Sequence, residues 1–209
     1  MKSYSEASER NRGPILAVLR RWLNGSCRVL EIGSGNGQHA VYFADALPHV
    51  FWQATDRAES LPDVSEWIDD AALPNIGAAI ALDVKDERWP ATDFDAVFSA
   101  NTAHIMGWPE VELMITRSAA ALRPGGLFLL YGPFNYGGRF TSESNARFDA
   151  GLRARAAHMG IREFEAVDAR ARAAGFALIE DNAMPANNRL LVWRRNADAP
   201  RADPGGERA

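Results

Sequence analysis

Residues 29–37 read Val-Leu-Glu-Ile-Gly-Ser-Gly-Asn-Gly, and this stretch carries most of the fold prediction. Its first four residues have the apolar character of a short buried strand that contains one carboxylate. The alternating glycines lead into an apolar run, beginning at Gln38, that has the composition of a helix. Because glycine lacks a Cβ and accepts positive φ angles, such a strand-to-helix turn lets a ligand approach the backbone closely.

The spacing of the glycines indicates which ligand the turn accepts. A dinucleotide-binding Gly-x-Gly-x-x-Gly pattern would need glycine at position 38, which is Gln38 here. Glu31 lies two residues before the first glycine, where a carboxylate repels a pyrophosphate but suits an ammonium group. The pattern resembles the first motif of class I methyltransferases, which use S-adenosylmethionine (SAM). It predicts a set of cofactor-binding residues: Glu31, Gly33, Ser34, Gly35 and Gly37. The alternative is a tight turn that only caps the following helix.

The composition favours one α/β domain. The chain has 209 residues, 47% of them hydrophobic, which is enough for a full core over residues 1–195. Residues 196–209 have no apolar periodicity, and we expect a disordered tail there. The net charge of −4 provides no basic field, so we do not expect a nucleic-acid partner.

Cysteine content and hydropathy point to a cytoplasmic protein. Cys27 is the single cysteine, which excludes an internal disulfide and fits a reducing compartment. No apolar run approaches the roughly 18 residues of a membrane span, and the first residues do not form an apolar signal segment. We therefore expect no membrane association. The oligomeric state stays open between a monomer and a homodimer.

Strand and helix patterns alternate along the chain, which predicts a doubly wound sheet. Predicted strands cover 29–32, 50–55, 76–82, 95–100, 127–131, 177–182 and 189–195, and predicted helices cover 12–23, 61–72, 109–122 and 163–174. In such sheets, ligands bind beyond the carboxyl ends of the strands, where the strand order switches. Polar residues fall at or near several of these ends.

Three of these polar residues suit a nucleoside. Asp56 follows the second strand, where a carboxylate accepts hydrogen bonds from ribose hydroxyls. Asp83 is placed to accept from the adenine amino group while the backbone of Val84 meets the ring edge. Asn101 follows the fourth strand and completes the predicted cofactor site. A turn-forming role for Asp56 and a helix N-cap role for Asp83 are the alternatives.

Several segments resemble the methyltransferase-like 26 family, also catalogued as domain of unknown function 938, a branch of the class I methyltransferases. They are 9–16, 34–39, 101–105, 131–134, 141–149, 160–162 and 184–188, including the runs Gly-Gln-His and Met-Pro-Ala-Asn-Asn. The resemblance covers about residues 6–195. It implies a Rossmann-like, seven-stranded, mostly parallel sheet with an antiparallel closing strand, and SAM as cofactor. It implies no settled substrate, and Met159 stands where the family usually has tryptophan.

Methyl transfer to a neutral acceptor requires removal of a proton, and His104 is the candidate base. It lies three residues after Asn101, beyond the fourth strand, and an imidazole titrates in the useful range. A hydrogen-bonding or helix-start role for His104 is the alternative.

The remaining site predictions concern the mouth of the pocket. Tyr131, Phe134 and Tyr136 are predicted to form an apolar lid over a planar substrate, and Asn187 to line its entrance. A packed loop is the alternative for the aromatic residues. Arg10 and Asn11 are expected to precede the first helix in a segment that folds over the cofactor, with Arg10 pairing with the methionine carboxylate.

Three functions remain open after this reading. The leading one is a SAM-dependent methyltransferase for a small molecule. The second is methylation of RNA or protein, for which the basic stretch 144–162 is the only support, and the third is a SAM-binding sensor or scaffold without catalysis. Gln38 and Glu31 disfavour a nicotinamide oxidoreductase. No set of residues has metal-ligand spacing, so we predict no metal.

Overall fold

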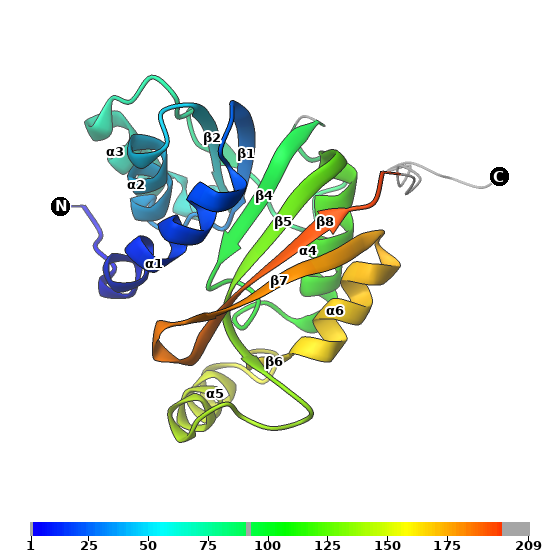
Figure 1. Cartoon of the computed structure of the whole chain (residues 1–209). Helices are drawn as coiled ribbons and strands as arrows, with labels where there is room; N and C mark the ends of the chain where they lie inside the picture. The colour runs from blue at the N-terminus through cyan, green and yellow to red at the C-terminus, as the bar shows by residue number, and fades with distance from the viewer. Residues whose placement is uncertain (1, 91–92, 198–209) are drawn as a thin grey trace.

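A twisted sheet with the strand order β3-β2-β1-β4-β5-β8-β7 runs through the molecule, and a short strand, β6, pairs with the end of β5 (Figure 1). The computed structural model describes residues 2–90 and 93–197. The strands are β1 (Cys27–Ile32), β2 (Val50–Asp56), β3 (Ile80–Ala81), β4 (Phe94–Ala100), β5 (Leu122–Asn135), β6 (Arg162–Glu163), β7 (Phe176–Met184) and β8 (Asn188–Arg195). All neighbours from β3 to β5 are parallel, whereas β8 runs antiparallel to both β5 and β7. The predicted fold class is confirmed.

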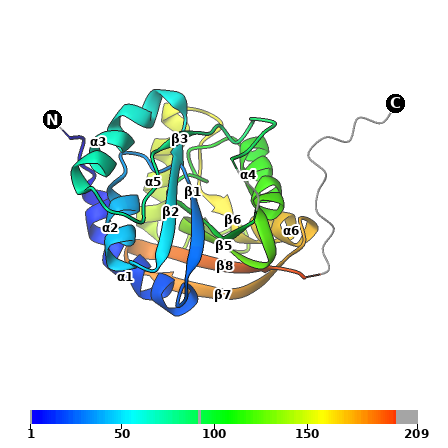
Figure 2. The same ribbon diagram turned by 90° about the horizontal axis from the view of Figure 1, so that it is seen from above.

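Helices cover both faces of the sheet. They are α1 (Glu6–Trp22), α2 (Gln38–Ala46), α3 (Leu61–Ala71), α4 (Trp108–Ala121), α5 (Glu143–Arg155) and α6 (Phe164–Ala173), with short 3-10 turns at Ala58–Ser60 and Pro185–Asn187. Figure 2 shows α1, α2 and α3 on one side of the sheet and α4 and α6 on the other. Figure 1 shows α5 apart from both layers, beyond the carboxyl end of β5.

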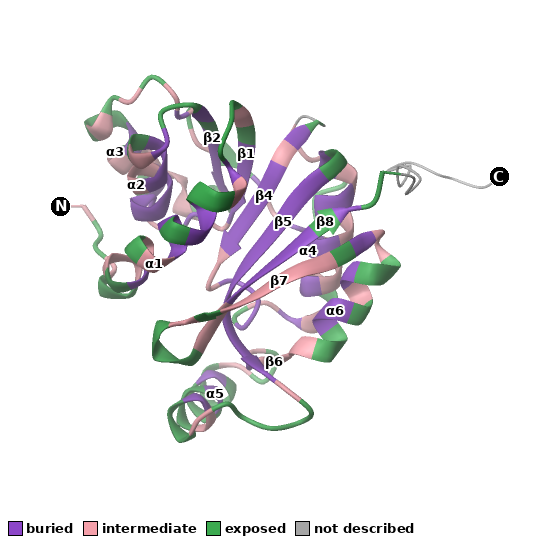
Figure 3. Ribbon diagram, viewed as in Figure 1, coloured by how far each residue is buried: buried purple, intermediate pink, exposed green. Residues whose placement is uncertain are grey.

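The two helical layers follow from the alternation of side chains along buried strands. In β5, Leu129 and Tyr131 join the apolar cluster under α1 and α2, whereas Phe128 and Leu130 join the cluster under α4 and α6. Successive side chains point to opposite faces of a strand, so a strand covered on both sides reads as a continuous apolar run. Figure 3 shows this burial along β4 and β5.

Three predicted elements have bounds that differ from the observed ones by more than two residues at one end or both. The first helix begins at Glu6 rather than at residue 12, because Ser5 caps it by accepting a hydrogen bond from the Ser8 amide. The third strand is reduced to two residues, with an isolated bridge between Trp52 and Ile76, because the Gln53 side chain bonds the Ala78 carbonyl in place of a ladder. The fifth strand extends to Asn135 because its pairing with β8 continues to Pro133 and its last two residues pair with β6.

The path of the chain defines one switch in strand order. It passes from β1 outward to β2 and β3 and then crosses to β4, on the other side of β1. The carboxyl ends of β1 and β4 therefore diverge into loops on opposite sides of the sheet, and this is where open α/β sheets bind ligands.

No helix within the described ranges is long and apolar enough to cross a membrane. From position 198 onward, the tail predicted for 196–209 lies outside the described residues.

Candidate functional site

A cleft of about 1220 Å³ lies at the carboxyl ends of the central strands. It is lined by the N-terminal segment, the glycine loop, the ends of β1 and β2, the loops after β3 and β4, and residues of α5. Ligand pockets of about 300–1,000 Å³ are typical for small molecules, so this cleft is large enough for a nucleoside cofactor beside a second ligand.

The glycine loop forms one wall of this cleft. Gly33 and Gly35 have φ angles of +71° and +64° and line the cleft. Ser34 lines it as well, and its amide donates to the Thr55 carbonyl at 3.0 Å. A Cβ added at Gly35 would meet no atom within 4 Å, so the backbone is open on that side.

Gly37 has a different role from the one predicted. Its φ is +90°, and an added Cβ would lie 3.1 Å from the Val64 carbonyl oxygen on α3. The residue does not belong to the cleft lining. Glycine is required there because α3 packs directly against the start of α2.

Glu31 also lies outside the cleft, beneath the loop. Its Oε2 accepts hydrogen bonds from the Ser34 hydroxyl and from the Trp52 indole, both at 2.9 Å. Burial raises the pKa of this carboxyl from 4.5 to about 7, against the lowering effect of those two hydrogen bonds. The predicted contact with a ligand ammonium group is therefore wrong in its geometry, because Glu31 supports the loop from inside.

Asp56 lies at the end of β2 and faces the cleft. Its carboxylate accepts the Gly35 amide at 2.6 Å and the Arg57 amide at 2.7 Å. Each carboxylate oxygen keeps a further lone pair for a ligand hydroxyl. Asp56 therefore forms the turn and lines the cleft, so the two roles considered for it do not exclude each other.

Asp83 is brought next to Asp56 by a hydrogen bond from the Leu82 amide to the Asp56 carbonyl, at 2.8 Å. Its Oδ1 accepts the Lys85 amide at 2.8 Å, in a turn rather than at the start of a helix, so the N-cap alternative is wrong. Asp83 and the buried Val84 both line the cleft.

The loop after β4 faces the glycine loop. Asn101 has a φ of +61°, a conformation that asparagine tolerates better than most residues, and it lines the cleft. The Ser99 hydroxyl donates to the Ile32 carbonyl at 2.8 Å and lies 2.6 Å from the Thr102 hydroxyl. These bonds tie the loop after β4 to the end of β1.

Arg10 and Asn11 lie within α1, not before it, and their side chains face different surroundings. The exposed Arg10 lines the cleft and pairs with Glu6 at 3.2 Å. Asn11 is buried and its Oδ1 bonds His39 Nε2 at 2.6 Å. Asn11 is outside the cleft lining, so its predicted cofactor contact is not supported by the geometry. It joins α1 to α2 instead.

The segment before α1 adds cleft residues that the sequence did not reveal. Ser3, Tyr4 and Ser5 all line the cleft. The Ser3 carbonyl accepts from Asn36 Nδ2 at 2.9 Å and from Trp67 Nε1 at 3.0 Å. The segment therefore runs across the glycine loop, and it lies over this end of the cleft.

His104 lies at the other end of the same cleft. Its ring is 7% exposed and meets the Phe148 ring edge-on, with 5.2 Å between centroids. Burial, with a smaller contribution from the Arg162 charge, lowers the pKa of His104 from 6.5 to about 4. The imidazole is therefore neutral at pH 7.

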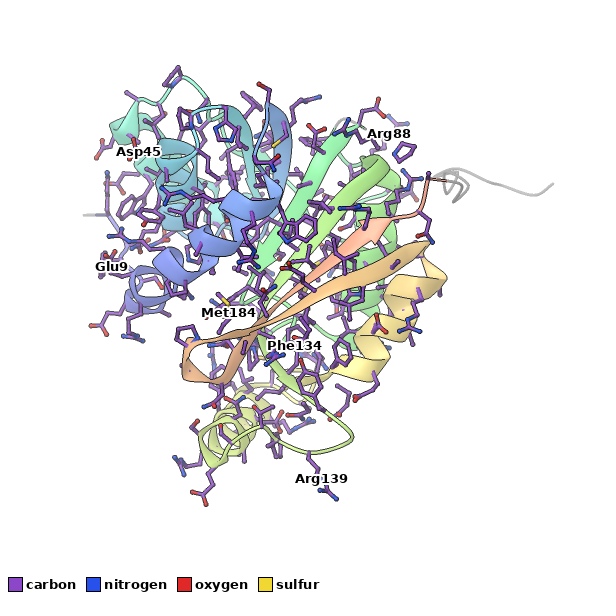
Figure 4. All side chains as sticks on the ribbon, viewed as in Figure 1. Glu9, Asp45, Arg88, Phe134, Arg139 and Met184 are labelled. Carbon is purple, nitrogen blue, oxygen red and sulfur yellow. The ribbon has the colours of Figure 1, made fainter. Side chains whose placement is uncertain are left out.

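The four residues predicted to bind substrate do not line the cleft. Tyr131 and Phe134 are 2% and 1% exposed in the two core clusters, and Figure 4 shows Phe134 inside the protein. The Tyr136 hydroxyl donates to Asp181, and its ring stacks on Phe164. Asn187 donates its side-chain amide to Ser144. The predicted aromatic lid is wrong, because Tyr131 and Phe134 are buried within β5 and Tyr136 packs against Phe164 and bonds Asp181.

Other residues surround His104 in place of that lid. Ile105 and Met106 follow it in the loop, Phe148 and Asn145 come from α5, and Met159 comes from the segment after α5. Ile105 and Phe148 are 42% and 44% exposed and both line the cleft, so both are accessible to a ligand there. In the sequence, the family resemblance of 101–105 and 141–149 and the departure from it at Met159 marked parts of this wall.

A metal centre was not predicted. Within residues 2–90 and 93–197, no three His, Cys, Asp or Glu side chains are grouped to hold a metal ion. The absence of a metal stays a prediction.

The sheet order and the glycine loop at the switch point define the Rossmann-like fold of class I methyltransferases. The family described as "Protein of unknown function (DUF938)" matches residues 2–195, nearly the whole chain. The chain belongs to this family.

More distant similarities extend to named methyltransferases. A fatty-acid O-methyltransferase of Mycolicibacterium smegmatis is 30% identical over 103 residues, which cover 49% of this chain and 35% of that protein. An O-methyltransferase family protein from Burkholderia thailandensis superposes with a TM-score of 0.80 at 18% identity, over 92% of this chain and 58% of the other. The S-adenosylmethionine-dependent methyltransferase SibL gives a TM-score of 0.76 at 24% identity, over 90% and 55%. The chain thus spans about a third of the curated relative and just over half of these two structures.

Proposed function

We propose that this chain is a SAM-dependent methyltransferase that acts on a small molecule, with residues 1–195 as its methyltransferase domain. One observation carries the proposal. A single cleft holds the open backbone of the glycine loop, the carboxylates of Asp56 and Asp83, and, at its other end, the imidazole of His104. A nucleoside site and a neutral base thus share one cleft.

The residues present fit SAM. Asp56 has free lone pairs for the two ribose hydroxyls, and Asp83 with the Val84 backbone provides an acceptor and a donor for the adenine edge. The loop backbone at Gly35 is open toward the cleft and leaves room for the methionyl part, which bears no phosphate. Arg10 supplies a positive charge for the methionine carboxylate.

When bound, SAM supplies a methyl group that is already activated by its sulfonium. The protein has to orient the acceptor, exclude water and accept a proton. Orientation of two reactants in one cleft contributes on the order of 7–11 kcal/mol. His104 accepts the proton of the acceptor as a general base, a role worth about 10²–10⁴-fold in rate. It is neutral at pH 7 and so has a free lone pair for this proton, while its lowered pKa makes it a weaker base than an ordinary imidazole.

The acceptor end of the cleft suits a small, partly apolar molecule. Ile105, Met106 and Phe148 offer apolar surface, while Asn145 and Asn188 provide amide groups. The local match to a fatty-acid O-methyltransferase favours oxygen as the acceptor atom. The net charge of −4 supports a small molecule over RNA.

The test is transfer of label from methyl-labelled SAM into cell extract, which is then separated into small-molecule, RNA and protein fractions. The proposal predicts label among the small molecules, lost with Asp56→Ala and reduced with His104→Asn, and retained with the exposed control Asp45→Ala. Label confined to RNA or protein would refute the small-molecule acceptor. Tight SAM binding without label in extracts from several growth conditions would refute catalysis in favour of a sensor or scaffold.

A further inference from the structure

Two loops meet behind His104, and Arg162 lies between them. Its Nε donates to the Ala103 carbonyl at 2.9 Å, and its Nη2 donates to the His158 carbonyl at 2.9 Å and also to the Met106 carbonyl. The first and last of these carbonyls lie on either side of His104 in the loop after β4. One guanidinium therefore holds both flanks of the candidate base.

The backbone of His104 itself is held by the same neighbouring segment. The Gly160 amide donates to the His104 carbonyl at 2.9 Å. A Cβ added at Gly160 would lie 2.9 Å from Arg153 Nη2, so the segment is tightly packed from the other side. The contact between the two loops thus leaves little freedom for the His104 main chain.

Asp149 of α5 anchors that segment in turn. The carboxylate is buried, and its Oδ1 accepts the Ile161 amide at 2.7 Å. Its Oδ2 accepts Arg153 Nε at 2.6 Å. Arg162, in contrast, has no carboxylate within ion-pair distance in the described part of the chain, so its charge is directed only at carbonyl oxygens.

We propose that Arg162 is a positioning residue, which locks the 101–107 loop and holds the His104 imidazole at the acceptor end of the cleft. This inference rests on the proposed function, in which His104 takes the acceptor's proton. The guanidinium has a second effect, because its nearby positive charge disfavours a second positive charge on the imidazole. The other charged or titratable groups around this end are Lys85, Glu110 and His158 in the lining, with Asp149 and Arg153 behind the 156–162 segment.

The test compares Arg162→Met with Arg170→Met by NMR. Arg170 is a matched control, since it is also a partly buried arginine but bonds Thr116 on α4. Titration of the His104 ring protons, assigned through His104→Asn, reports the pKa of the imidazole, and amide exchange at Gly160 reports the loop contact. Arg162→Met should raise the pKa of His104 by about half a unit to one unit and speed Gly160 exchange about tenfold or more. Arg170→Met should change neither.

The inference is overturned if Arg162→Met, folded and binding S-adenosylhomocysteine like wild type, keeps both values, or if the control shifts them equally. Should Arg162→Met not fold, Arg162→Lys takes its place, because lysine keeps the charge but cannot reach all three carbonyls. Faster Gly160 exchange with an unchanged pKa of His104 then supports the inference, and unchanged exchange refutes it. Neither readout involves methyl transfer. If His104→Asn leaves turnover intact, the proposed base fails while the positioning result stands.

Discussion

Replacing Asp56 with alanine removes the carboxylate that is proposed to bind the ribose hydroxyls. Hydrogen bonds to a charged acceptor are worth about 1.5–3 kcal/mol, which corresponds to an approximately ten- to hundredfold rise in the Kd for SAM. The carboxylate also accepts the amides of Gly35 and Arg57, at 2.6 and 2.7 Å, so its loss frees the loop as well. We therefore expect the upper part of that range.

Isothermal titration calorimetry with SAM and with S-adenosylhomocysteine measures this change. Asp56→Asn should fall between wild type and Asp56→Ala, since it keeps one acceptor oxygen but presents a donor in place of the other. Asp45→Ala is the control, because Asp45 is exposed on α2, away from the cleft (Figure 4). A folded Asp56→Ala protein whose Kd lies within about threefold of wild type would show that the nucleoside site is misplaced.

Three further predictions follow from charge and burial. His104→Asn should lower turnover by about 10²–10⁴-fold with little change in SAM affinity. In the wild type, kcat/KM should not fall on the acid side until the pH approaches the His104 pKa of about 4. A fall in kcat/KM centred near pH 6.5 would contradict the lowered pKa. Arg10→Ala should weaken SAM binding only about two- to fivefold, because the side chain is 71% exposed and solvent screens its charge. The effect should be larger at low salt, and an unchanged Kd there would refute the proposed pairing with the methionine carboxylate. Glu31→Gln should gain free energy of unfolding relative to wild type as pH rises. The folded state of the wild type holds a proton on Glu31 up to about pH 7, whereas the ordinary pKa is 4.5, so wild-type stability falls across that window. Between pH 4.5 and pH 7, the free energy of unfolding of Glu31→Gln should rise relative to that of the wild type by on the order of 2–3 kcal/mol, as measured by urea denaturation at these two pH values. A difference between the two proteins that stays constant over this range would refute the raised pKa of Glu31.

Much of the cleft wall formed by the glycine loop and the strand ends could be predicted because it depends on local pattern. The alternating glycines dictate a turn with positive φ, and Asp56, Asp83 and Asn101 each follow a strand whose apolar run is visible in the sequence. Parallel strands in register bring such ends to one edge of the sheet, so predicting the strands was enough to predict that these residues meet.

Which residues of the glycine motif face the cleft and which face the interior could not be predicted in the same way. Glu31 and Gly37 belong to the same motif as Gly33 and Gly35, yet they face Trp52 and α3 rather than the cleft. Consecutive residues of a turn point to different neighbours, and only the packing of α3 and β2 decides which of them meet solvent.

By itself the sequence determined the class of fold, the glycine loop and the carboxylates along it, since these follow from periodicity and residue chemistry over short stretches. The tertiary structure alone decided the acceptor end. Pairing of β5 with β8 and then β6 continues the strand to Asn135, and the core clusters on the two faces of the sheet bury Tyr131 and Phe134. Helix α5 brings Phe148 to the ring of His104. The physical reason is that this wall is built by contacts between segments far apart in the chain, whose pairing depends on packing that no local pattern records.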